Sequence, residues 1–393
     1  MRPDSLPIVR LGDLASMTSG GTPNSSVRQY YGGGIPWVSI SDMTSSGKYI
    51  TQTHKTLSED GMRASAAKLY EPNVVLYAMY ASLGECSISS GRVTSSQAIL
   101  AIKPGPKLDT EFLYYFLQSI KSRVKTMGQQ GTQSNLNANM VRDFKIPLPS
   151  QAMQRQIARM LGDVDLLISS AEQLIAKKQR TKQGMLQNLL TGRTRLPGFV
   201  GEWSTTTFGE LATTSRDRVS PREAEGRVIE LEHLASGTGK LLGDADVRSS
   251  VSLKTLFVEG DVLFGKLRAY LRKYWLADRG GFCSTEIWAL RARPGVSIGS
   301  YLRFIVERAE FIDTASNAYG THMPRSDWRV VSQFEVDLPP IDEQRAIAEV
   351  LLDVDREIEA LENRLKSAQA IKQGMMQELI TGRTRLATAE VAA

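Results

Sequence analysis

One stretch of this 393-residue sequence combines cationic and aromatic side chains at spacings that point to a chemistry. It runs from residue 264 to 280 and reads FGKLRAYLRKYWLADRG. Lysine and arginine neutralise phosphate groups, and arginine also pairs with guanine in the major groove. The stretch therefore predicts a surface that binds nucleic acid. The alternative is an exposed hairpin that carries ordinary solvated cations.

The residues that could support catalysis form no recognisable set. Residues 237–243 read GTGKLLG, but Lys240 is followed by leucine where a phosphate-binding loop needs serine or threonine. The sequence has no Asn/Asp-Pro-Pro-aromatic motif of an amino-methyltransferase and no nuclease signature. The three histidines lack the spacing of metal ligands: His54, His233 and His322. We expect a chain without catalytic residues, bound metal or bound cofactor.

The bulk composition is that of an ordinary soluble protein. Hydrophobic residues make up 41% and charged residues 23%, and no apolar run approaches the roughly 18 residues that cross a bilayer. Cys86 and Cys283 lie far apart and form no CxxC pair, which suits a reducing compartment. A net charge of +6 permits nucleic-acid binding without requiring it. These features predict a cytoplasmic protein with no membrane segment.

The chain is an internal duplication. KQGMLQNLLTGRTRL (residues 182–196) returns as KQGMMQELITGRTRL (residues 372–386), with twelve of fifteen positions identical. The match extends upstream from IPLPSQAMQ (146–154) to VDLPPIDEQ (336–344) at the same offset of 190. Earlier parts of the two copies have diverged but still correspond. We predict four segments: a first domain at 1–149, a helix at 150–196, a second domain at 197–339, and a helix with a tail at 340–393.

Both constant segments are predicted to be helices of about 40 residues. Prolines precede each segment, and Thr-Gly follows each one. Apolar residues recur in steps of three and four, which is typical of a coiled coil. The first helix carries eight Lys/Arg against three Asp/Glu (150–196) and the second carries seven against ten (340–393), so opposite charges favour their pairing. The apolar seam comprises Ile157, Leu161, Val164, Ile168, Ile175, Met185 and Leu189 in the first helix, and Ile347, Leu351, Val354, Ile358, Leu361, Leu365, Met375 and Leu379 in the second. The alternative is two amphipathic helices, each packed on its own domain.

The variable units have the pattern of mixed α/β domains. Strand-like runs such as VVLYAM (74–79) and DVLFGKL (261–267) stand between glycine-rich turns. Residues 110–124 and 300–312 are predicted to form one helix each, at matching places in the two copies. The fold class is therefore α+β, with two mixed α/β domains separated by two long helices and related by an internal pseudo-two-fold repeat.

The sequence resembles the specificity (S) subunits of type I restriction–modification enzymes. The residues that carry the resemblance are SGGTPNSS…YYGGGIPWVSISDM (19–43), GTQSNLNANMVRDFKIPLPS (131–150), GTHMPRSDWRVVSQFEVDLPP (320–340) and the two helices that end in TGRTRL. It covers essentially the whole chain. The second unit lacks the GGTP…GGIPW stretch of the first, so its reading surface need not use the same loop.

The resemblance implies a non-catalytic, sequence-specific DNA-binding subunit. Each domain would be a target-recognition domain that reads one half of a bipartite target in double-stranded DNA. The two helices would be antiparallel, would set the spacing, and would dock two modification (methyltransferase) subunits. Restriction (motor-nuclease) subunits would complete the complex, and S-adenosylmethionine would be bound by the modification subunit rather than by this chain.

The motif positions nominate DNA-binding residues in both units. Asparagine and glutamine suit adenine, and arginine suits guanine, although any of these side chains could instead contact phosphate or be structural. The nominated residues are Tyr77, Tyr80, Arg92, Gln133 and Asn135 in the first unit, and Lys266, Arg268, Tyr270, Arg272, Lys273, Thr321, His322 and Arg325 in the second. Two other classes remain open at this point: an enzyme, and a coiled-coil scaffold that binds no nucleic acid.

Overall fold

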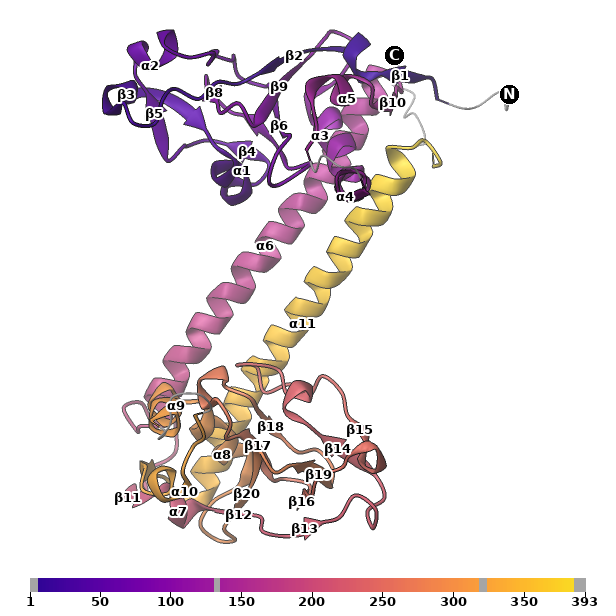
Figure 1. Cartoon of the computed structure of the whole chain (residues 1–393). Coiled ribbons are helices and arrows are strands. Elements are labelled where there is room, and N and C mark those ends of the chain that lie inside the picture. The colour runs from indigo at the N-terminus through magenta and orange to yellow at the C-terminus, as the bar shows by residue number, and fades with distance from the viewer. Residues whose placement is uncertain (1–5, 131–134, 318–323, 385–393) are drawn as a thin grey trace. The chain divides into compact units, whose positions relative to one another are not determined.

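The computed structural model divides the chain into two compact units. It describes residues 6–130, 135–317 and 324–384, and for residues 127–130 it describes the backbone alone. The first unit comprises residues 1–172 and 363–393, and the second comprises residues 173–362. Each unit joins one globular domain to parts of both long helices, which are drawn in magenta and yellow in Figure 1.

The domain of the first unit is built on a five-stranded sheet of order β2-β9-β6-β7-β4, accompanied by a three-stranded sheet of order β5-β3-β8. A further antiparallel pair, β1-β10, joins the beginning of the domain to its end. The strands are β1 Ile8–Arg10, β2 Ala15–Ser19, β3 Tyr31–Val38, β4 Tyr49–Ile50, β5 Lys55–Leu57, β6 Val75–Ala78, β7 Cys86–Ser89, β8 Thr94–Ser95, β9 Ile99–Pro104 and β10 Lys145–Pro147. The short helices are α1 Ile40–Ser46, α2 Glu59–Arg63, α3 Thr110–Ser119, α4 Lys121–Gln130 and α5 Ala138–Arg142.

The domain of the second unit contains a four-stranded sheet of order β12-β20-β17-β18 and a five-stranded sheet of order β13-β16-β19-β14-β15. The pair β11-β21 again joins the domain's beginning to its end. The strands are β11 Ser204–Thr207, β12 Ala212–Thr214, β13 Arg218–Val219, β14 Arg227–Ile229, β15 Ala245–Asp246, β16 Lys254–Phe257, β17 Val262–Gly265, β18 Tyr274–Leu276, β19 Gly281–Ser284, β20 Ile287–Ala292 and β21 Glu335–Leu338. The short helices are α7 Phe208–Leu211, α8 Gly299–Glu307, α9 Ala309–Ser316 and α10 Trp328–Val331.

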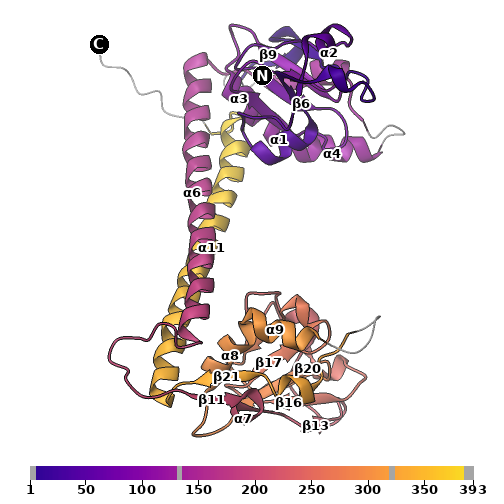
Figure 2. The same ribbon diagram turned by 90° about the vertical axis from the view of Figure 1, so that its left-hand side faces the viewer.

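The two domains share one substructure. The strand order β2-β9-β6-β7 of the first corresponds to β12-β20-β17-β18 of the second, and every neighbouring pair in both is antiparallel. Helix α3 packs on β6, β7 and β9, and α8 packs on β17, β18 and β20 (Figure 2). The mixed α/β class and the internal repeat predicted from the sequence are therefore present in the structure.

The two predicted long helices are α6 (Gln151–Leu189) and α11 (Ile341–Leu379), each of 39 residues. Both begin directly after the proline-containing segments and end before a glycine in the left-handed conformation, with φ +67° at Gly192 and +70° at Gly382. A left-handed residue closes a helix because its amide bonds back to the last turn, and glycine adopts it without a steric penalty.

A buried glutamine fastens each helix to its domain. The Gln154 amide donates to the carbonyls of Lys107 and Pro149, at 3.0 and 2.9 Å. The amide of Gln344, exactly one repeat later in α11, donates to Val296 and Pro339 at 2.9 and 3.0 Å. Both side chains are fully buried, so these bonds satisfy polar groups that would otherwise cost about 1–3 kcal/mol each. The glutamine that ends each of the repeated segments 146–154 and 336–344 thus has a structural role.

Each unit buries the beginning of one long helix together with the end of the other. Ile157, Leu161 and Leu379 belong to the core of the first unit, and Leu189 and Leu351 belong to the core of the second. All fifteen predicted seam residues are buried or half-buried. Within each unit, therefore, the two helix segments run antiparallel.

The prediction of one helix each for residues 110–124 and 300–312 is wrong. In the second unit, Arg308 has an extended backbone, with φ −59° and ψ 143°, and this separates α8 from α9. In the first unit, Ile120 ends α3 with ψ near 0° before α4 begins. The apolar periodicity continues through both breaks, so the residue pattern did not reveal them.

Candidate nucleic-acid interface

The two equivalent hairpins carry a strained residue at the same place. The hairpin β6–β7 has its loop at residues 79–85, and β17–β18 has its loop at residues 266–273. Ala81 in the first loop and Arg268 in the second adopt the left-handed region, with φ +59° and +54°. A non-glycine residue in this region costs of order 1–3 kcal/mol, and such strain concentrates at functional sites. The shared conformation marks both loops as candidate binding elements.

The second loop presents an aromatic side chain between two arginines. Arg268 and Arg272 are both left-handed and bracket a 3₁₀ turn, Ala269–Leu271. Ala269 is buried beneath the turn, whereas Tyr270 is exposed. Among the described residues, the side chains of Lys266, Arg268 and Arg272 make no hydrogen bond or ion pair. Three cationic groups around an exposed ring can contact phosphates and bases.

Arg325 lies against this loop and is held by a carboxylate. Leu267 forms an isolated antiparallel bridge with Arg325, and the amide of Ser326 donates to the Lys266 carbonyl at 2.9 Å. The guanidinium donates from Nε to Glu286 Oε2 at 2.8 Å and from Nη2 to Oε1 at 3.1 Å. The hydrogen bond that Arg325 donates to Glu286 raises the pKa of Arg325 above its ordinary value. Arg325 is thus a permanently charged and fixed donor at the side of the loop.

Asn135 takes the corresponding place in the first unit. The amide of Leu136 donates to the Met79 carbonyl at 3.0 Å, just as Ser326 bonds to Lys266 in the second unit. Asn135, directly before Leu136, is exposed beside the first loop, which also carries the exposed Tyr80. The structure therefore brings Tyr80 and Asn135 together in one unit, and Lys266, Arg268, Tyr270, Arg272 and Arg325 together in the other.

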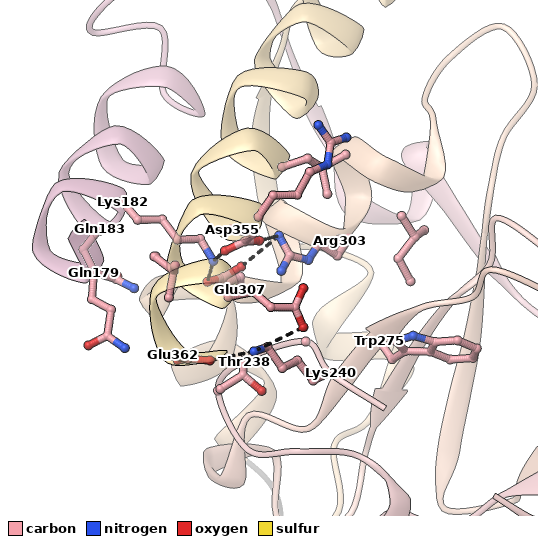
Figure 3. A pocket seen from close by; sticks show the side chains of 17 residues that line it. Gln179, Lys182, Gln183, Thr238, Lys240, Trp275, Arg303, Glu307, Asp355 and Glu362 are labelled. Carbon is pink, nitrogen blue, oxygen red and sulfur yellow. Dashed lines mark hydrogen bonds and ion pairs between the residues drawn. The ribbon is translucent and has the colours of Figure 1, made fainter. Parts of the chain in front are cut away.

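Charged side chains in the second unit fasten its domain to the segments of the long helices (Figure 3). Lys182 Nζ lies 2.5 Å from a Glu307 oxygen and 2.7 Å from an Asp355 oxygen. Arg303 Nη1 lies 2.5 Å from the second Asp355 oxygen. A pocket lined by these residues, Lys240 and Trp275 opens beside the cluster. Because α6, α8 and α11 each contribute a charged residue, the cluster fixes the domain's orientation on its helix segments.

The first unit repeats this cluster with fewer charges. Lys372 lies 2.6 Å from Asp165, one repeat away from the pair Lys182–Asp355. The Tyr115 hydroxyl donates to the other Asp165 oxygen at 2.7 Å. Burial, followed by this bond to a carboxylate, raises the pKa of Tyr115, so the hydroxyl stays protonated as a donor. The repeated helix phrase thus provides an equivalent lysine–aspartate pair to each unit.

The described residues contain no group of three or more His, Cys, Asp or Glu side chains placed to hold a metal ion. Within the same residues, no helix has the length and apolarity needed to span a membrane. Residues 237–243 form a turn in which Lys240 pairs with Glu362 at 2.7 Å. The lysine of this segment therefore serves the helix attachment.

A comparison with protein families decides what kind of protein this is. The model described as "Type I restriction modification DNA specificity domain" matches residues 3–178 and 251–370. The chain belongs to this family. Two relatives are the EcoDI specificity subunit of Escherichia coli, 23% identical over 74% of this chain and 72% of its own length, and the MjaVIII specificity subunit of Methanocaldococcus jannaschii, 22% identical over 98% and 94%.

Solved structures of the specificity family share the fold along the whole chain. The S subunit from M. genitalium matches with a TM-score of 0.59 at 14% identity, covering 97% of both chains. A second solved structure matches with a TM-score of 0.60 at 16% identity, covering 97% of this chain and 99% of that one. It comes from work on complex assembly and conformational transition of the type I R-M system. The architecture is therefore that of a type I specificity subunit.

Three of the nominated residues do not lie at either loop surface. Tyr77 is completely buried against Phe144, and burial raises its pKa, so its nomination as a DNA contact is wrong. Lys273 points inward, where its Nζ donates to the Leu231 carbonyl at 2.6 Å. Arg92 pairs with Glu71 at the opposite end of the β6–β7 hairpin from the loop. Gln133, Thr321 and His322 lie outside the described residues.

Sequence reasoning missed Glu286 as a partner of Arg325. Glu286 lies with Thr285 in the turn between β19 and β20. The sequence does show an acidic residue, Glu286, near the cationic stretch. It does not show which cation that residue contacts, because Glu286 and Arg325 are 39 positions apart.

Proposed function

We propose that each domain of this specificity subunit reads one half of a bipartite DNA target through its hairpin loop. Membership in the family makes the chain a specificity subunit, and the catalytic activities of a type I system reside in its partner subunits. The observation that carries the proposal is the repeated hairpin, which keeps the strained position at Ala81 and Arg268 while the exposed side chains around it differ. A constant framework with variable loop residues suits two different half-sites.

Base recognition is assigned to the exposed loop residues. Asn135 suits an adenine, and Arg325 suits a guanine. Tyr80, Lys266, Arg268, Tyr270 and Arg272 surround them and can contact bases, sugars or phosphates. Gln133, Thr321 and His322 stay in the proposal on their sequence positions alone. Arg92 is assigned a phosphate contact rather than a base contact, because it lies at the far end of its hairpin.

The long helices are proposed to form an antiparallel coiled coil that sets the distance between half-sites. The seam is buried or half-buried throughout, and basic α6 meets acidic α11 in the pair Lys178–Glu357, whose atoms lie 2.5 Å apart. The four segments 1–149, 150–196, 197–339 and 340–393 are the corresponding functional parts. The repeated helices would offer equivalent docking surfaces to two modification subunits.

The partners complete the proposed complex. Two modification subunits would bind S-adenosylmethionine and methylate the target, and restriction subunits would add the motor and the nuclease. This chain would bind no cofactor itself. The complex would work in the cytoplasm, where its double-stranded DNA substrate is found.

The test is a domain exchange read by methylome sequencing. Residues 1–149 are replaced by the corresponding domain of another specificity subunit, and the complete system is expressed in a host that lacks it. We expect one half of the methylated motif to change while the other half and the spacing persist. A change in both halves would overturn the assignment of one half-site to each domain.

A salt titration separates this function from that of a scaffold. The full chain with its modification subunits should bind duplex DNA with an affinity that falls steeply as salt rises, because phosphate contacts release counterions. Binding without salt dependence, or no binding at all, would favour a coiled-coil scaffold. Methyl transfer by the purified chain alone would instead favour an enzyme.

A further inference from the structure

We infer that Glu286 is a specificity-determining positioning residue, which orients the Arg325 guanidinium toward a guanine in the second half-site. This inference rests on the proposed function, since it assumes that the second loop reads DNA. It adds a residue that the nominated DNA contacts do not include. It also predicts that one position of the second half-site is a G·C pair.

The geometry leaves the correct edge of the guanidinium free. Arg325 uses Nε and one hydrogen of Nη2 for the two oxygens of Glu286, at 2.8 and 3.1 Å. A guanidinium carries five N–H donors in one plane, so Nη1 and the second hydrogen of Nη2 remain available. These donors form the edge that binds guanine O6 and N7 in a bidentate manner. Glu286 therefore fixes the plane of the guanidinium without occupying its reading edge.

Both partners are anchored to one residue of the loop. The Lys266 amide donates to the Glu286 carbonyl at 3.0 Å, and the Lys266 carbonyl accepts from the Ser326 amide at 2.9 Å. Ser326 is itself buried and donates from Oγ to the Ala315 carbonyl at 2.6 Å. Because the carboxylate and the guanidinium are tied to the same short stretch of backbone, their relative position is set by the fold.

A carboxylate here does not serve affinity for phosphate. The Arg325 side chain is 54% exposed and Glu286 is 26% exposed, and such pairs contribute little to stability, with a median of about 0–1 kcal/mol. A negative charge beside the loop also repels phosphates. The pair therefore weakens non-specific binding, and its remaining benefit is orientation, which a base contact needs more than a phosphate contact does.

The first unit supplies an internal comparison. There the Met79 amide donates to the Ala98 carbonyl at 2.9 Å, so Ala98 occupies the place of Glu286. The reading residue beside it is Asn135, which is neutral and suits adenine. The carboxylate thus accompanies the charged reader and is absent where the reader is neutral. We expect a G·C pair in the second half-site where the first half-site has an A·T pair.

The experiment measures base preference at every position of the target. The full chain, with its modification subunits, is bound to duplexes that carry the methylated motif and each single-base substitution of it. Arg325→Lys should lower the preference for guanine over other bases at one position by about 5- to 150-fold, the range of a good bidentate contact. Glu286→Gln should relax the same position by roughly tenfold, while binding to an unrelated duplex stays equal or tightens, because a negative charge is removed.

The control is Asp143→Asn in the first unit. It removes the carboxylate partner of Arg10, whose 50% exposure matches that of Arg325, and it should leave the second half-site unchanged. Melting temperatures of all variants should stay close to that of the wild type. The inference is overturned if Glu286→Gln keeps the guanine preference. It is also overturned if that variant lowers the base preference at every position together with the melting temperature. A wild-type complex with no bipartite preference would instead refute the proposed function.

Discussion

Two tyrosines that look alike in the sequence have opposite roles in the structure. Tyr77 and Tyr80 stand three residues apart in the stretch that ends β6 and enters the loop. Tyr77 is completely buried and its hydroxyl has no hydrogen-bond partner among the described residues, whereas Tyr80 is 40% exposed beside Asn135. Tyr77 lies in β6, whose four residues are all buried, whereas Tyr80 lies in the loop that follows the strand.

This difference gives a paired prediction. Tyr77→Phe removes an unsatisfied buried hydroxyl and should leave the free energy of unfolding unchanged or raise it by about 1 kcal/mol. Tyr80→Ala should weaken binding to the cognate duplex, by up to about tenfold if its ring stacks on the DNA, with little effect on stability. Chemical denaturation and duplex binding measure the two effects. A loss of stability in Tyr77→Phe would show that the hydroxyl has a partner, such as a buried water.

The sequence indicated residue types at the site but not their neighbours. Asn135 and Arg325 were nominated from the two GT-containing motifs, and the structure places both beside the hairpin loops. Contacts between distant segments bury Tyr77, hold Lys273 inward and pair Glu286 with Arg325. A single sequence contains no direct record of such contacts, since propensity and periodicity report only local structure.

At the scale of elements, the long helices were the most predictable part of the chain. Proline before each helix and glycine after it are local signals, and the seam has a single dominant period. The breaks between α3 and α4 and between α8 and α9 were missed, because the domain's packing imposes them on a continuous apolar pattern. The buried ion cluster at Lys182 was also missed, because its partners Glu307 and Asp355 are distant in the sequence.

Lys182 and Lys372, which occupy equivalent positions in the two long helices, should differ in their contribution to stability. Lys182 is 7% exposed and bridges Glu307 and Asp355, whereas Lys372 is 24% exposed and pairs, among the described residues, with Asp165 alone. Lys182→Met leaves buried carboxylates short of a cation and should destabilise the chain by about 3 kcal/mol. Lys372→Met should cost about 1 kcal/mol.

Thermal unfolding of both variants tests this ranking. Lys372→Met is the matched control, because it makes the same chemical change at the equivalent position of the repeat. Equal melting temperatures for the two variants would contradict the special role given to the four-charge cluster of the second unit.

At the scale of the whole molecule, the proposed coiled coil acts as a ruler. Seven residues inserted after Ile175 keep the heptad in phase and lengthen the helix by about 10 Å. Since successive base pairs are about 3.4 Å apart, the unspecified gap in the target should grow by roughly three base pairs. Both half-site sequences should persist. Methylome sequencing reports the gap directly.

A two-residue insertion at the same place is the out-of-phase control. It rotates the following residues by about 200° and moves the seam away from its partner, so modification should fall sharply. An active seven-residue variant with the original gap would show that the modification subunits, rather than the helices, set the distance.

The division of the chain into units also has a consequence for its synthesis. The second unit is one continuous segment, residues 173–362, whereas the first unit is interrupted and takes its last core residues, Leu379 and Ile380, from the far end of the sequence. A ribosome therefore releases every residue of the second unit before the first unit can close its core. Domains usually fold in order from the N-terminus. Here we expect the later domain to complete its structure first, because the core of the earlier one includes residues of α11.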